Sequence, residues 1–203
     1  EREAKAFFEW FINIIPERLK ILTNAIRADD KRVASKLDFS PDSLIHLGKW
    51  FAKKVSTRKR TKEEIAIEQA TFIKFQGVKA ADWTLTEETF SLCFDIGIYF
   101  GEIFRRKFKD IQWTYITKPK SHIDRNWPLL SSFRINMNPI KMVSGLAYSV
   151  VDNTYIVGEL REVYKKWAKE LRENWLKQGK TWIYIGPKKY QKYLMEWEKV
   201  GKK

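Results

Sequence analysis

Apolar side chains recur at spacings of three and four residues along much of the chain, which is the pattern of amphipathic helices. A polar connection at 56–64 separates two such stretches, and alternating stretches interrupt them in the middle of the sequence. The pattern predicts helices over residues 3–28, from Ser40 onwards, through 65–73, over 86–108, from Asn138 to Val151, over 158–178 and over 187–200.

Local signals define the ends of these helices. Ser40 is a favourable N-cap with Pro41 at the first helical position, and Asn138 followed by Pro139 repeats the arrangement. Pro16 lies inside the first helix, where it lacks an amide hydrogen and its ring clashes with the preceding turn. We therefore expect Pro16 to kink or split that helix.

The segment from Phe90 to Phe104 differs from the others, because its apolar side chains cover most of the helix circumference. Thr86 is placed to cap this helix, and Glu87 and Glu88 follow at the positive end of its dipole. A helix that is apolar on most sides is typically buried. The sequence therefore predicts a central, buried helix.

Two stretches after this helix have the character of strands. The segment "IQWTYIT" (111–117) alternates apolar and polar residues, and "PLLSSFRI" (128–135) follows it, with a further short strand expected at 181–186. Helices, then a small sheet, then helices indicate an α+β domain rather than alternating βαβ units. We expect a mainly helical α+β fold with a small, mostly antiparallel sheet.

A chain of 203 residues, 44% of them hydrophobic, is long enough for one sizeable core, so we expect a single domain over 1–203. Residues 1–36 would form an N-terminal helical segment, 37–155 the α+β core, and 156–203 a basic, aromatic-rich helical extension. Tryptophan and tyrosine alternate with lysine in this extension, as in surfaces that stack bases. Most of these rings fall on helical stripes, however, and are expected to pack inward.

The charge balance indicates the class of partner. Lysine and arginine number 39 against 25 acidic residues, a net charge of +14, which favours a polyanion such as nucleic acid, an anionic membrane face or an acidic protein. The single cysteine, Cys93, offers no disulfide framework or cysteine metal cluster and fits a reducing cytoplasm. No run approaches the length of a membrane span, so we expect a cytoplasmic protein that is neither secreted nor membrane-spanning.

Asp95 and Glu102 are the carboxylates of the apolar helix. They lie seven residues apart on one helix face, about 10 Å along the axis, which exceeds the spacing of most glycosidase pairs. An unpaired buried carboxylate would cost several kcal/mol, so we expect both to be structural and Glu102 to be paired with a cation or hydrogen-bonded. A weaker hypothesis is an enzyme built around Glu102 with His122 or Asp124.

No motif nominates a catalytic residue, a metal site or a cofactor. The only histidines, His46 and His122, do not have the spacing of a zinc site, and the sequence contains no G-x-S-x-G motif or glycine-rich phosphate loop. We expect no enzymatic activity, no metal and no cofactor.

Two basic clusters are candidate binding surfaces. The cluster 105–109 ends the central helix, where its cations are favourable simply because they face the negative end of the dipole. The other lies in and before the polar connection and is the better candidate for contact with a partner. Its residues are Lys53, Lys54, Arg58, Lys59, Arg60 and Lys62.

Three motifs together resemble a loose group of uncharacterised bacterial α+β domains: "LDFSPDSL" (37–44), "GIYFGEIFRRKF" (97–108) followed by Trp113, and "MNPIKMV" (137–143). In that group a helix with a Y-x-G-E core leads into a strand with tryptophan, and an N-P pair starts a later helix. Some members belong to toxin and immunity loci. The resemblance implies no established catalytic residue.

The charge, the missing catalytic motifs and the resemblance favour one function. We expect a non-enzymatic immunity protein that binds and occludes an acidic protein partner, such as a toxin domain. The toxin would not be a nuclease, because proteins that cover a nucleic-acid-binding surface are expected to be acidic. The alternative is an accessory protein that binds nucleic acid through the first basic cluster.

Overall fold

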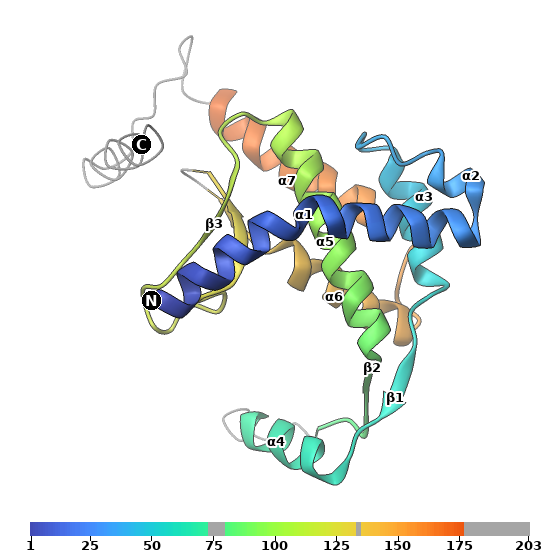
Figure 1. The fold of residues 1–203 in the computed structure, drawn as a ribbon, viewed down its shortest axis with the longest axis vertical. Coiled ribbons are helices and arrows are strands. Elements are labelled where there is room, and N and C mark those ends of the chain that lie inside the picture. Colours follow the sequence, from blue (N-terminus) through green and yellow to red (C-terminus); the bar gives the residue numbers. More distant parts are fainter. Residues whose placement is uncertain (73–79, 133–134, 177–203) are drawn as a thin grey trace.

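The structure is a computed structural model that describes residues 1–72, 80–132 and 135–176 (Figure 1). Its helices are α1 Arg2–Asp29, α2 Lys31–Ala34, α3 Ser43–Ala52, α4 Lys62–Phe72, α5 Glu87–Lys107, α6 Pro139–Val151 and α7 Glu159–Leu176. Its strands are β1 Thr57–Lys59, β2 Trp83–Leu85, β3 Gln112–Tyr115, β4 Pro128–Ser131 and β5 Asn136–Met137. The predicted mainly helical α+β fold is confirmed. In these ranges no helix is both long enough and apolar enough to cross a membrane.

α5 is the central helix, and every residue from Asp95 to Phe104 is buried. The side chain of Thr86 caps it by accepting a hydrogen bond from the amide of Thr89, so the predicted cap is confirmed. α1 crosses α5 on one side and α6 packs against it on another (Figure 1). The segment of α5 from Asp95 to Phe104 is therefore enclosed by its neighbours.

The strands form two antiparallel sheets where the sequence predicted one. β1 pairs with β2, and β4 lies between β3 and β5. β1 falls inside the predicted polar connection 56–64, where the sequence pattern did not predict a strand. Its three residues are polar and carry no apolar alternation, so only pairing with β2 fixes them as a strand. The two predicted strands are present but shorter, ending at Tyr115 and Ser131.

Two predicted helix signals are corrected. α1 runs without a break through Pro16, so the expected split is wrong. Buried residues on both sides of the proline, among them Ile15 and Leu22, anchor the helix to one core and hold it continuous. α3 begins at Ser43 rather than at Pro41, because i to i−3 hydrogen bonds back to residues 40–42 make a tighter turn before the helix.

α7 packs into the same core as the helices before it. Its buried side chains lie three or four residues apart and join the cluster around Phe100 and Phe104 of α5. The prediction that apolar side chains of the extension pack inward is therefore confirmed for its described part. The expected strand at 181–186 and helix at 187–200 lie outside the described residues. The buried α7 residues are Leu160, Tyr164, Ala168 and Leu171.

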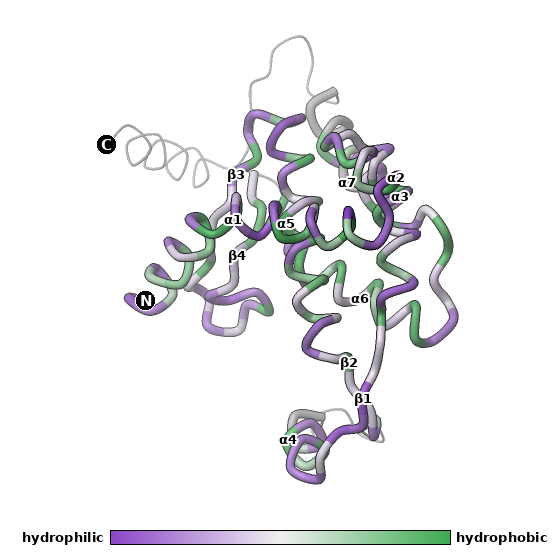
Figure 2. The backbone as a smooth tube through the Cα atoms, turned by 45° about the vertical axis from the view of Figure 1, so that its right-hand side comes forward, coloured by the Kyte–Doolittle hydropathy of each residue, from purple (hydrophilic) through white to green (hydrophobic). Residues whose placement is uncertain are grey.

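β1, α4 and β2 form an arm that leaves the helical body (Figures 1 and 2). The base of the arm is anchored, since Leu85 is fully buried and the ring of Trp83 packs against Tyr148 of α6. α4 lies at the far end of the arm in both views. Ala66, within this helix, is exposed.

Candidate functional site

Glu102 is held between a strand and its own helix. The indole Nε1 of Trp113 on β3 donates a hydrogen bond of 2.8 Å to Oε1 of Glu102. One guanidinium nitrogen of Arg105, one turn further along α5, contacts both carboxylate oxygens at 3.0 and 3.2 Å. Glu102 is only 8% exposed, so its charge needs such donors to be tolerated. These contacts join β3 to α5 through the carboxylate, as expected if Glu102 is structural.

Two glycines of α5 let neighbouring elements approach closely. A Cβ on Gly101 would overlap the ring of Trp113 and lie 2.7 Å from its Cη2. A Cβ on Gly97 would lie 2.7 Å from the backbone Cα of Ile140 at the start of α6. The "GIYFGE" spacing therefore supplies one contact surface for β3 and another for α6.

The "LDFSPDSL" segment docks on the same helix through Tyr99. The amide of Phe39 donates a hydrogen bond of 2.9 Å to the Tyr99 hydroxyl, which also lies 2.8 Å from Oγ of Ser43. The rings of Phe39 and Tyr99 are stacked with centroids 4.6 Å apart. All three motifs that carry the resemblance thus meet on α5.

Asp95 joins α5 to α1. Its Oδ1 lies 2.5 Å from Nε of Arg18, and Nη2 of the same arginine donates to Ser91. Asp95 is 2% exposed, and burial raises the pKa of its carboxyl to about 6, although the Arg18 guanidinium opposes that shift. Asp95 and Glu102 thus have separate cationic partners, and neither shares its contacts with the other.

Three of the six cations predicted to bind a partner form ion pairs within the chain. Nζ of Lys54 lies 2.7 Å from Oδ1 of Asp29, and Oδ2 of the same carboxylate accepts a hydrogen bond from the indole N–H of Trp50. Arg60 lies 3.6 Å from Glu68 of α4. These pairs lower the number of free positive charges in the first basic cluster.

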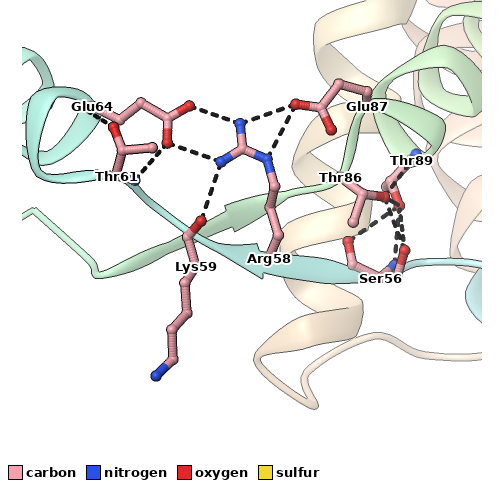
Figure 3. Close-up of polar contacts among 8 residues, drawn as sticks. All are labelled: Ser56, Arg58, Lys59, Thr61, Glu64, Thr86, Glu87 and Thr89. Carbon is pink, nitrogen blue, oxygen red and sulfur yellow. Dashed lines mark hydrogen bonds and ion pairs between the residues drawn. The ribbon is translucent and has the colours of Figure 1, made fainter.

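Arg58 is the third paired cation, and it has two partners (Figure 3). Its guanidinium makes two parallel bonds, of 2.7 and 2.8 Å, to Glu64 on α4, and it also contacts Glu87 at the start of α5. Glu64 in turn closes a capping box with Thr61. Arg58 therefore ties the arm to the body, and its hydrogen bonds hold the pKa of the Glu64 carboxyl at about 2.

The other three members of the cluster are Lys53, Lys59 and Lys62. All three are exposed, and none forms an ion pair with a residue that the structure describes. Lys59 points away from the network of Arg58, because side chains alternate along β1 (Figure 3). These ammonium groups are free to bind carboxylate or phosphate groups.

In the second basic cluster, at the end of α5, only some of the cations form ion pairs within the described structure. Arg105 pairs with Glu102, whereas Cζ of Arg106 lies 3.5 Å from the ring centroid of Phe39. Lys107 and Lys109 are exposed and have no ion-pair partner among the described residues. The sequence did not predict the contact between Arg106 and Phe39, because these two residues lie far apart in the chain.

Asp124 is held in a local network apart from Glu102. It accepts hydrogen bonds from Asn138 and Lys141 at 2.9 Å each, and its amide donates to Nδ1 of His122. The contacts do not bring His122 or Asp124 to Glu102. The described part of the chain also contains no group of histidine, cysteine and carboxylate side chains that could hold a metal ion.

Comparison with known proteins found no matching family model, curated protein or solved structure.

Proposed function

We propose that this protein is a non-enzymatic cytoplasmic binding protein that recognises an acidic face of another protein. The observation that carries the proposal is a division of charge. The carboxylates of the buried helix, Asp95 and Glu102, have cationic partners, whereas several exposed lysines, among them Lys59 and Lys62, have none in the described structure. Unpaired surface cations steer association with an oppositely charged protein.

Within that class, the resemblance supports an immunity protein that occludes a toxin domain. Its partner would carry an acidic surface, which fits a toxin other than a nuclease. The test is to co-express the chain with the protein encoded by the neighbouring reading frame and to measure growth and complex formation. Growth rescue together with a complex whose affinity falls with salt is expected; a stable complex without rescue would remove the immunity role but keep the binding role.

The contribution of the first basic cluster is tested with a triple charge reversal of its unpaired lysines, Lys53→Glu, Lys59→Glu and Lys62→Glu. A matched control replaces three exposed lysines on other helices, Lys20, Lys31 and Lys166, by glutamate. Both proteins have the same net charge, so a difference in affinity depends on where the lysines lie. We expect the cluster variant to bind the partner at least about tenfold more weakly than the control. Equal affinities would show that these three lysines lie outside the interface.

Nucleic acid remains the competing partner, and the ion pairs of Lys54, Arg58 and Arg60 argue against it. A protein that follows a phosphate backbone needs many unpaired cations, and its affinity falls steeply with salt in proportion to the phosphates neutralised. Titration with random duplex and single-stranded DNA at several salt concentrations separates the two partners. We expect weak binding to either DNA; tight binding with a slope of several contacts would overturn the proposal.

A further inference from the structure

The side chain of Arg106 is positioned by an aromatic stack at the end of α5. The Cζ atom of its guanidinium lies 3.5 Å from the centroid of the Phe39 ring, and the Phe39 ring is itself stacked on Tyr99, with an interplanar angle of 24°. The Tyr99 ring is almost fully buried, so the base of this stack is fixed in the core. An arginine held on a ring loses less side-chain entropy when it binds than a free one does.

The hydrogen-bond donors of Arg106 are unused within the described structure. Arg18, Arg58 and Arg105 each donate to a carboxylate of this chain, but Arg106 has neither a hydrogen bond nor an ion pair among the described residues. The residue is also exposed. A planar guanidinium held in position with its donors available has the geometry that binds a carboxylate through two parallel hydrogen bonds.

The backbone under this stack is strained. Phe39 has a φ of 59°, in the left-handed region that aromatic residues rarely occupy. The hydrogen bond from its amide to the Tyr99 hydroxyl holds that conformation and so places the ring under Arg106. Strained backbone of this kind persists where the surrounding structure enforces it, and it is concentrated at binding sites.

We infer that Arg106, presented on Phe39 at the end of α5 and flanked by Lys107 and Lys109, binds a carboxylate side chain of the acidic protein partner. This inference rests on the proposed function and identifies a residue that contacts the partner. A single carboxylate matches the fork of one guanidinium, and the two exposed lysines attract further acidic groups around it.

Exposed acidic residues beside the cluster favour a protein over nucleic acid. Asp38 directly precedes Phe39 in the chain, Asp110 directly follows Lys109, and both are exposed. A phosphate backbone carries closely and evenly spaced negative charges and would meet these carboxylates. A protein can place one aspartate or glutamate on Arg106 and keep its other acids away from Asp38 and Asp110.

The probe for this inference is a fluorescent poly-glutamate peptide, with single-stranded DNA of similar length as the comparison. Arg106→Gln removes the fork, Arg106→Lys keeps the charge but not the fork, and Phe39→Leu removes the ring. Arg27→Gln is the matched control, since Arg27 is an exposed arginine near the end of another helix. Thermal melts of each variant verify that it is folded before binding is measured.

We expect Arg106→Gln and Arg106→Lys each to weaken peptide binding by about tenfold, Phe39→Leu to weaken it by a smaller factor, and Arg27→Gln to change it less than about twofold. Equal losses in Arg106→Gln and Arg27→Gln would show that only net charge matters and would overturn the assignment of Arg106. If DNA binds more tightly than the peptide and Arg106→Gln weakens DNA binding by the same factor, Arg106 binds a phosphate rather than a carboxylate, and the inference is overturned. If the unaltered protein binds no peptide even at low salt, the proposed function itself fails.

Discussion

The indole N–H of Trp113 donates a hydrogen bond of 2.8 Å to Oε1 of Glu102, across a contact in which Gly101 leaves room for the ring. One carboxylate thus joins β3 to the central helix, and Arg105 balances its charge. Removing Arg105 would leave this buried carboxylate without a compensating charge, and removing Trp113 would take away one of its hydrogen bonds, so we expect the carboxylate to be structural. Function is then expected on the exposed cations.

Gly101→Ala tests how closely β3 packs on α5. The added Cβ would overlap the ring of Trp113, so either the indole or the helix must move. We expect the free energy of unfolding to fall by about 1–3 kcal/mol in a urea titration. Gly145→Ala is the matched control, because nothing lies within 4 Å of the Cβ position on that helical glycine. The control should gain about 0.5–1 kcal/mol; equal changes in the two variants would contradict the close approach.

Arg58→Met tests the attachment of the arm. Losing the contacts to Glu64 and Glu87 should speed amide hydrogen exchange in β1 and α4, while the core of α5 keeps its protection. The pKa of the Glu64 carboxyl, held at about 2, should return toward 4.5 in an NMR titration, because Arg58 is the main cause of its shift. Lys59→Met, on the other face of β1, should change neither measurement. Unchanged exchange in the Arg58 variant would show that other contacts orient the arm.

Asp95 should give the protein a pH dependence of a particular sign. Burial raises its pKa from 3.8 to about 6, so between these values the folded state binds a proton that the unfolded state does not. The contribution of Asp95 to the free energy of unfolding therefore decreases as pH rises from about 4 to about 6. The full change is about 3 kcal/mol, at about 1.4 kcal/mol per pKa unit.

The measurement is urea unfolding of the unaltered protein and of Asp95→Asn across this pH range. Other carboxyls, such as Glu64, have lowered pKa values and lose their contribution only at lower pH, and they are present in both proteins. The free energy of unfolding of the unaltered protein should therefore fall relative to that of Asp95→Asn as pH rises. The opposite slope would mean that Arg18 lowers the pKa of Asp95 more than burial raises it.

The parts of the fold that follow from local chemistry were predictable from the sequence. The central helix, its cap at Thr86 and the helix that begins with Asn138 and Pro139 all appear as expected, because caps and apolar periodicity act within a few residues. The break expected at Pro16 does not occur, because tertiary packing on both sides outweighs a local preference. β1 was missed, since three polar residues carry no strand signal without their partner.

The candidate site was less predictable, because its contacts join distant residues. Arg58 belongs to the basic run that the sequence nominated, yet Glu87, 29 positions away, occupies part of its guanidinium. The stack of Arg106 on Phe39 depends on a left-handed backbone and on a hydrogen bond to Tyr99 across 60 positions. Charge patterns locate cations in a sequence, but only the fold decides which of them are already paired.

The role of Glu102 is tested most directly by a double-mutant cycle with Trp113, using Glu102→Ala, Trp113→Phe and the combined variant. Urea unfolding of the four proteins isolates the energy of the pair from other effects of each substitution. We expect Glu102→Ala to lower the free energy of unfolding by about 1–3 kcal/mol, because the indole N–H of Trp113 loses its acceptor, with a coupling energy of about 1–3 kcal/mol between the two residues. A Glu102→Ala protein as stable as the unaltered one, with no coupling to Trp113, would contradict a framework role for this carboxylate.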